Sequence, residues 1–196
     1  MPRRTVVIGA IALLAIAGAA WLAFSRPWRQ PADAPAGTSA TPPTTTSDTR
    51  KITGTLYYVS EDGMSLVGVQ REVPFGETVL DQARHIVVAQ LGDAPGPFVS
   101  AVPPGTTLRG VFLTDRGDAF VDLSGEARTR HTGGALDELF TVYAIVNALT
   151  TNLPAVKRVQ ILVEGKEVDT LAGHVDLRHP LQKNLKWVRT DKTEKG

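Results

Sequence analysis

Residues 135–152, ALDELFTVYAIVNALTTN, are the stretch of sequence that decides the fold. Asp137 and Glu138 stand at its start, where the dipole of a helix favours negative charge, and Pro154 follows its end. Large apolar residues recur three and four positions apart, which is typical of a helix with one broad apolar face. They are Leu136, Leu139, Phe140, Tyr143, Val146 and Leu149. So wide a stripe predicts a helix that is buried against a sheet.

Segments rich in β-branched and aromatic residues surround this helix and predict strands. They are residues 52–59, 66–73, 108–114, 119–123 and 156–163, followed by a short extended piece at 168–171. Turn sequences at 61–63 (EDG) and 115–118 (DRGD) join the first four strands into two hairpins. A second helix is expected over residues 77–91, because apolar residues share one face there.

The expected order of elements is therefore β-β-α-β-β-α-β, with a short last strand. Hairpin strands interrupted by two helices are typical of the α+β class. We expect both helices to pack on one face of a mixed or antiparallel sheet, in a domain that covers residues 51–182. Residues 183–196 are interpreted as a basic C-terminal tail, since they contain Lys183, Lys186, Arg189, Lys192 and Lys195.

The first 50 residues differ in composition from the rest of the chain. Residues 5–24, TVVIGAIALLAIAGAAWLAF, carry no charge, and a helix of about 20 residues spans the ~30 Å hydrocarbon core of a bilayer. Arginines flank both ends of this run. Residues 1–29 are therefore interpreted as a single transmembrane helix, a membrane anchor with its N-terminus in the cytoplasm. A cleaved signal peptide is the alternative, with Ala23 and Ser25 at the cleavage site.

Residues 30–50, QPADAPAGTSATPPTTTSDTR, follow the predicted anchor. Pro, Ala, Thr and Ser dominate this segment, and it has no hydrophobic periodicity. Such a composition cannot bury enough apolar surface to offset the entropy of ordering. We interpret it as a disordered linker that separates the domain from the membrane.

Composition narrows the classes of function. The chain has 21 basic and 20 acidic residues, of which residues 1–50 hold five and two, so residues 51–196 hold 16 and 18. The domain therefore lacks the basic excess that nucleic-acid binding requires. There is no cysteine, which excludes a Cys nucleophile, a thiolate zinc site and a lipidated N-terminal Cys.

Two sets of residues resemble catalytic constellations. Ser124, His131 and Asp137 are the residue types of a nucleophilic triad, but no G-x-S-x-G motif surrounds the serine. Asp118 and Asp122 share one face of a predicted strand, but four residues along a strand place them ~13 Å apart, too far for a glycosidase pair. Solvated strand residues are the better interpretation. We expect no catalytic residues and no enzymatic activity.

Two further sets could bind ligands. His174, Asp176 and His179 lie within six residues, but their spacing is not that of a helical metal motif. We therefore expect no metal and no cofactor. Arg128 and Arg130 precede a glycine pair at the start of the long helix, where they could contact a carboxylate, a phosphate or a partner. They are the candidate contact residues of this sequence.

The succession of motifs resembles the GerMN domain family of sporulation and spore-germination proteins. The matching pieces lie within residues 53–181 and read LYY at 56–58, PGT at 104–106, AFVDLS at 119–124, AIVNALT at 144–150, VQILVEGK at 159–166 and GHVDL at 173–177. The resemblance implies a non-enzymatic, extracytoplasmic module of α+β fold, similar to ring-building domains of envelope assemblies. It also implies attachment to the membrane at the N-terminus.

The anchor and the resemblance together predict a membrane-anchored binding or assembly module of the bacterial cell envelope. It would act through contacts with an envelope protein or with a second copy of itself. The expected location is the bacterial inner membrane, with a single pass and the domain in the periplasm or otherwise outside the cytoplasm. The alternative is a domain that binds peptidoglycan or another envelope glycan, and a cell-wall hydrolase is a third reading. Nucleic acid is not an expected partner.

Overall fold

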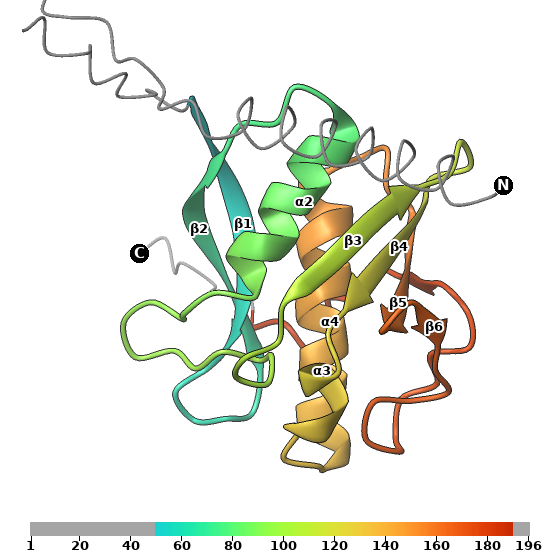
Figure 1. Cartoon of the computed structure of the whole chain (residues 1–196). Helices are drawn as coiled ribbons and strands as arrows, with labels where there is room; N and C mark the ends of the chain where they lie inside the picture. The colour runs from blue at the N-terminus through green and yellow to red at the C-terminus, as the bar shows by residue number, and fades with distance from the viewer. Residues whose placement is uncertain (1–49, 190–196) are drawn as a thin grey trace, which may run out of the picture. The chain divides into compact units, whose positions relative to one another are not determined.

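The computed structural model describes residues 50–189. The predicted anchor lies outside the described residues, as does all of the predicted linker before Arg50. With the labels of Figure 1, the elements are β1 (Lys51–Val59), β2 (Leu66–Pro74), α2 (Val79–Gln90), β3 (Leu108–Leu113), β4 (Asp118–Leu123), α3 (Glu126–Thr129), α4 (Ala135–Asn152), β5 (Arg158–Val163), β6 (Lys166–Glu167) and β7 (Leu181–Gln182). None of the helices within these residues is long and apolar enough to cross a bilayer.

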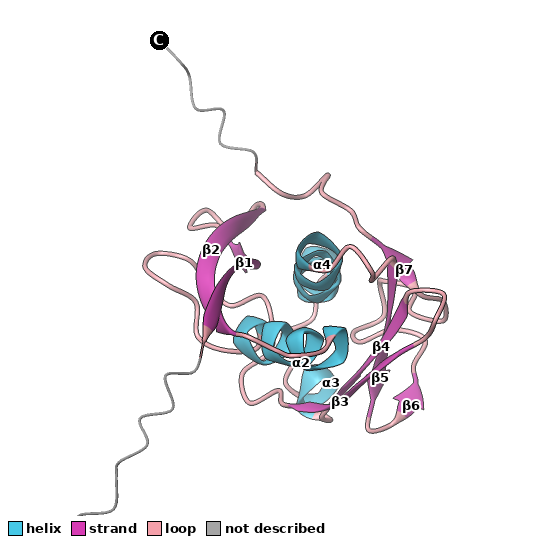
Figure 2. Cartoon of the chain, turned by 90° about the horizontal axis from the view of Figure 1, so that it is seen from above, coloured by secondary structure: helices cyan, strands magenta, loops and turns pink. Residues whose placement is uncertain are grey.

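The strands form two sheets. β1 and β2 make an antiparallel hairpin, and the second sheet has the order β3-β4-β5-β6 with β7 also paired to β5. Within the second sheet β4 and β5 are parallel, and the other pairs are antiparallel. Seen from above, α4 lies between the two sheets, and α2 lies beside it (Figure 2). The α+β class is confirmed, but the prediction of one sheet with both helices on one face is wrong.

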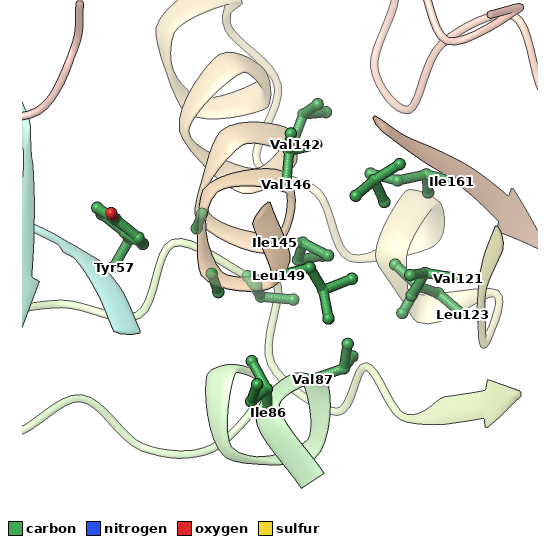
Figure 3. Packing of buried hydrophobic residues seen from close by; sticks show 14 of the residues in the cluster. Tyr57, Ile86, Val87, Val121, Leu123, Val142, Ile145, Val146, Leu149 and Ile161 are labelled. Atoms are coloured by element: carbon green, nitrogen blue, oxygen red, sulfur yellow. The ribbon is translucent and has the colours of Figure 1, made fainter. Parts of the chain in front are cut away.

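The position of α4 explains its broad apolar stripe, because both sheets and α2 contact it. Figure 3 shows Ile145 and Leu149 of α4 close to Val121 and Leu123 of β4, with α2 on another side. All four side chains are completely buried, and burial of such an aliphatic side chain stabilises the fold by about 1.5–3 kcal/mol. The helix has the predicted bounds, and it begins after Gly134, whose φ of 92° favours glycine.

Side-chain amides on the two helices pair with β1 where a third strand would otherwise lie. Gln90 of α2 accepts a hydrogen bond from the N–H of Tyr57 at 2.8 Å and donates one to its C=O at 2.7 Å. Asn152 of α4 makes the same two bonds with Thr55, at 2.8 and 2.7 Å. These two side chains, the edge amides, satisfy buried backbone groups that need partners. The hairpin is thus closed by helices instead of joining the second sheet.

The end of the described chain packs on the domain instead of leaving it as a tail. Asn147 of α4 accepts a hydrogen bond from the N–H of Asn184 and donates one to its C=O. Further on, Trp187 C=O accepts from the N–H of Leu66, and the N–H of Arg189 donates to the C=O of Leu66, both at 2.8 Å. The folded domain therefore extends to Arg189, beyond the predicted limit at residue 182.

Smaller differences concern short elements. The piece expected at 168–171 is a loop, and the two-residue strand β6 precedes it. The one-turn helix α3 and the strand β7 have no counterpart among the predicted elements. Both are shorter than a full period of the hydrophobic patterns that mark helices and strands.

Tyr58 and Tyr57 offer a matched pair of predictions. Tyr58 is completely buried, and its hydroxyl has no hydrogen-bond partner within residues 50–189; burial raises its pKa, against the opposing charge of Arg71. Tyr58→Phe should therefore leave the free energy of unfolding unchanged or raise it by up to ~1 kcal/mol. Tyr57→Phe should lower it by about 1 kcal/mol, because the Tyr57 hydroxyl bonds Thr151 at 3.0 Å.

Urea denaturation followed by circular dichroism measures both variants. A Tyr58→Phe variant that loses as much stability as Tyr57→Phe would show that the Tyr58 hydroxyl has a bonding partner after all.

The ionised carboxylate of Asp62 binds Arg189 at the end of the described chain, and protonation in acid removes this charge. Its carboxylate accepts from the Ser60 hydroxyl at 2.6 Å and the Met64 N–H at 3.0 Å, and it pairs with Arg189. The Ser60 hydrogen bond, then those of Met64 and Arg189, lower the pKa of Asp62 from 3.8 to about 2. A lowered folded pKa means that the stabilisation is complete above the ordinary value and is lost as the pH falls through the folded one.

We therefore expect the contact between Asp62 and Arg189 to be lost between pH 3.8 and about 2, while the backbone hydrogen bonds to Leu66 keep residues 187–189 on the domain. The indole N–H signal of Trp187 in NMR spectra measures this. In Asp62→Asn the same signal should be independent of pH across that range, and an unchanged titration in this variant would contradict the assignment.

Candidate functional site

Two hollows lie near α3, one lined by residues that follow it and the other by α3 itself. The first has a volume of about 410 Å³, and residues of the loop 99–104 together with Val59 and Phe140 line its apolar wall. Arg130, His131 and Asp137 stand on its polar side; we call this hollow the α4 pocket. The second has a volume of about 530 Å³ and is lined by α3, β6 and the loop after it; we call it the β6 hollow. The α4 pocket has the mixture of apolar wall and few polar groups that is typical of ligand sites.

The structure does not bring the two candidate arginines together. Arg128 lines the β6 hollow, and Arg130 lines the α4 pocket. Both side chains are exposed. Arg128 lies within α3, whereas Arg130 follows it as the C-cap with a φ of −108°, so the two side chains leave the backbone on different sides of the point where α3 ends. Each arginine could contact a ligand or partner, but only in its own hollow.

His131 is fixed by neighbours other than the predicted triad residues. Its Nδ1 accepts a hydrogen bond from the N–H of Gly133 at 3.1 Å, so the proton lies on Nε2, which is 3.2 Å from Thr141 Oγ1. Ser124 Oγ instead accepts from the N–H of Thr107 at 3.0 Å. Asp137 bonds the Thr132 hydroxyl at 3.3 Å. Within residues 50–189 the three side chains therefore form no hydrogen-bonded triad.

Asp118 and Asp122 are each paired with an arginine. Arg158 binds Asp118 through two nitrogens, at 2.7 and 2.9 Å, and Arg109 Nε lies 3.1 Å from Asp122. The N–H of Gly165 also donates to Asp122 at 2.7 Å. Both aspartates are buried, so their interpretation as solvated strand residues is wrong. These ion pairs connect neighbouring strands of the second sheet and form no shared acid–base pair.

Glu138 is a completely buried carboxylate that holds the loop after β6. It accepts hydrogen bonds from the N–H groups of Leu171 and His174, both at 2.7 Å, and lies 3.2 Å from His174 Nδ1. Burial alone would raise the pKa of Glu138, but the hydrogen bonds from Ala172, His174 and Leu171 outweigh it and lower the pKa. The glutamate thus positions one wall of the β6 hollow, to which Leu171 belongs.

Two of the three residues considered for a metal site, His174 and Asp176, serve other contacts. His174 faces Glu138, while Asp176 binds the guanidinium of Arg178 at 2.7 Å. No group of three or more possible metal ligands occurs in the described part of the chain.

Sequence reasoning missed the buried polar residues that hold the hairpin and the loops in place. Gln90, Asn147, Asn152 and Glu138 stand at polar positions inside otherwise apolar helical stretches. That placement is the signal that could have identified them, because a polar side chain on a buried face needs a buried partner.

Comparisons with known proteins agree with the fold. Residues 55–169 match the family model "Germane: Sporulation and spore germination". No curated protein matches the chain.

Two solved structures from Bacillus subtilis are similar. The first GerMN domain of the sporulation protein GerM is 19% identical, covers 67% of this chain and 97% of its own, and superposes with a TM-score of 0.53. The tandem GerMN domains of the same protein are 20% identical, with a TM-score of 0.51, and the match covers 69% of this chain and 46% of theirs. At this identity the likeness concerns the fold.

The family match spans more than half of the chain, from β1 to the loop after β6, and the described fold contains every matched segment. The chain therefore belongs to the Germane family of sporulation and spore-germination (GerMN) domains.

Proposed function

We propose that this domain is a non-enzymatic assembly module of the bacterial cell envelope, which joins a protein partner through the outer edge of β2. The observation that carries the proposal is the state of the two hairpin edges. The edge of β1 is occupied by the edge amides and by Val99, which pairs with Val59. The edge of β2 is largely open.

The strand register identifies the open groups. Thr55 and Tyr57 point their N–H and C=O groups away from β2, and they stand opposite Gln70 and Gly68. Both members of such an antiparallel pair point outward, so the outward groups of β2 belong to Gly68, Gln70 and, by the same alternation, Glu72. Within residues 50–189 no other segment pairs with these three backbones. Open backbone groups of this kind can pair with a strand of a partner protein.

Site-specific photocrosslinking in intact cells tests the proposal. A photoreactive residue at position 70 should form adducts with a partner protein or with a second copy of the chain. The matched control is position 157, where Lys157 is exposed immediately before β5 of the other sheet. Adducts at 157 but not at 70 would overturn the choice of surface, and adducts made only of wall glycan would favour the glycan-binding alternative.

Gln70→Pro provides an independent check. Proline removes the outward N–H of residue 70 while leaving the bonds between β1 and β2 in place, and proline is tolerated on strand edges for this reason. We expect loss of the crosslink formed from a neighbouring probe at Glu72, without loss of the folded circular-dichroism spectrum.

The proposed location is the inner membrane, with the predicted anchor at residues 5–24 holding the domain outside the cytoplasm. The uncharged run of the sequence supports it. Alkaline phosphatase fused to the C-terminus should be active in cells, and activity of a cytoplasmic reporter at the same position would contradict this topology.

Because Arg128 and Arg130 lie in different hollows, variants of the two residues can test the glycan-binding alternative. If the α4 pocket receives an acidic glycan, Arg130→Ala should weaken binding about five-fold, because a hydrogen bond to a charged group contributes about 1 kcal/mol or more. Arg128→Ala is the control, since Arg128 lies in the other hollow. Calorimetric titration with muropeptides measures both, and equal affinities for the two variants and the unchanged protein would count against this alternative.

A further inference from the structure

The segment after β7 carries large side chains back to the β1–β2 hairpin. Figure 2 shows it passing beside α4 on its way from β7. Asn147 holds Asn184, and Leu66 holds Trp187 and Arg189 by backbone hydrogen bonds. Residues 184–189 therefore form part of the folded surface, and the position of their side chains is set by the domain.

This surface exposes large apolar side chains. Met64, in the β1–β2 turn, is 68% exposed, and Leu185 and Trp187 are 47% and 41% exposed. Met64 and Trp187 line one shallow hollow together with Lys186. We call Met64, Lys186 and Trp187, together with Lys183 and Leu185, the exposed residues of the same segment, the Trp187 patch. Exposed apolar side chains that cluster in this way mark a surface that contacts something other than water.

The charges around the patch are mainly positive. Lys183 and Lys186 are exposed, and neither forms an ion pair within residues 50–189. Arg189 is neutralised by Asp62, which leaves Glu61 as the other acidic side chain of the turn. The patch therefore combines unpaired positive charge with exposed tryptophan, leucine and methionine side chains. This combination complements a partner that has an anionic surface and an apolar interior.

An anionic bilayer has this chemistry. Tryptophan favours the level of the lipid headgroups, lysines bind phosphates while their stems cover apolar surface, and each lysine near such a surface contributes about 1 kcal/mol. The predicted linker of 21 residues reaches at most ~60 Å, which keeps the domain near the membrane that holds the predicted anchor and raises its effective concentration there.

We propose that the Trp187 patch docks the domain onto an anionic lipid surface. This inference rests on the proposed membrane attachment, which keeps the domain close to the lipid. In the docked domain the loop between β1 and β2 and the residues around Trp187 would face the bilayer.

The test uses the full chain with Trp21→Phe and Trp28→Phe, so that Trp187 is the only tryptophan. The protein is reconstituted in phosphatidylcholine vesicles with and without phosphatidylglycerol, and brominated lipids report contact by quenching Trp187 fluorescence. We expect a blue shift and quenching of Trp187 fluorescence in the anionic vesicles, both reduced by salt.

Lys183→Gln and Lys186→Gln should each lower the equilibrium constant for docking about five-fold. Lys157→Gln and Lys166→Gln are the matched controls and should change nothing.

Flotation of the vesicles distinguishes this proposal from the membrane attachment. If the chain floats but Trp187 is neither shifted nor quenched, docking is overturned while the anchor stands. If Trp187 is quenched when the predicted anchor is deleted and lipid is in excess, docking stands without the anchor. If Trp187 is shielded equally in the absence of lipid and only at high protein concentration, a second copy covers the patch and the lipid proposal is wrong.

Discussion

Replacing Gln90 by methionine is expected to lower the free energy of unfolding by about 3 kcal/mol. Methionine fills a similar volume, so the loss reports the hydrogen bonds and not a cavity. Gln90 is completely buried and is the partner of both the N–H and the C=O of Tyr57. Without it, two buried backbone groups lose their partners, and each unpaired group costs about 1–3 kcal/mol.

Gln70→Met is the matched control for this variant. Gln70 is exposed on β2, and its side chain donates to Thr55 Oγ1 at the surface, so the change should be within about 0.5 kcal/mol. Urea denaturation of the two variants in parallel gives the difference. Equal stability of Gln90→Met and Gln70→Met would show that the edge of β1 does not depend on its helical partner.

Replacing Glu138 by alanine is expected to cost a similar amount, about 3 kcal/mol, at neutral pH. The carboxylate is completely buried and receives the N–H groups of Leu171 and His174 at 2.7 Å. Removing it leaves these donors without a partner and opens a cavity beside them. Glu167→Ala, at an exposed position of β6, is the control and should be nearly neutral.

The stabilisation by Glu138 is expected to decrease as the pH falls. The pKa of Glu138 is lowered in the folded protein from an ordinary value of 4.5, so its stabilisation is present above pH 4.5 and is lost as the pH falls through the folded value. The stability difference between the unchanged protein and Glu138→Ala should therefore narrow in acid. Hydrogen exchange at the amides of Leu171 and His174 locates the effect, and protection unaltered in the variant would contradict the role of Glu138.

Local patterns in the sequence predicted most elements correctly. The helix at residues 135–152 was predicted with its observed bounds, because its apolar period is long and a glycine pair and a proline delimit it. The strand predicted at residues 119–123 is confirmed as β4, and its alternate residues Ala119, Val121 and Leu123 are completely buried. Alternation along one strand determines which side chains point inward, and it depends on that strand alone.

The arrangement of sheets could not be predicted in the same way. Alternation does not say which strand lies beside which, and the decisive partners of β1 are two helix side chains, Gln90 and Asn152. The same limit applies to Asp118 and Asp122, whose burial depends on arginines that stand elsewhere in the chain, Arg158 and Arg109. The separation of Arg128 from Arg130 depends on α3, a helix too short to leave a periodic signal.

The bonds between Thr55 and Asn152 join residues 97 positions apart, which has a consequence for biosynthesis. During synthesis the first hairpin emerges from the ribosome long before Asn152 does. An isolated two-stranded hairpin is at best marginally stable in water. The hairpin is therefore not stably folded until α4 has been synthesised and can pack against it. The first hairpin therefore gains one of its two helical partners only after most of the domain has been synthesised, which leaves a long window in which a chaperone can hold the chain.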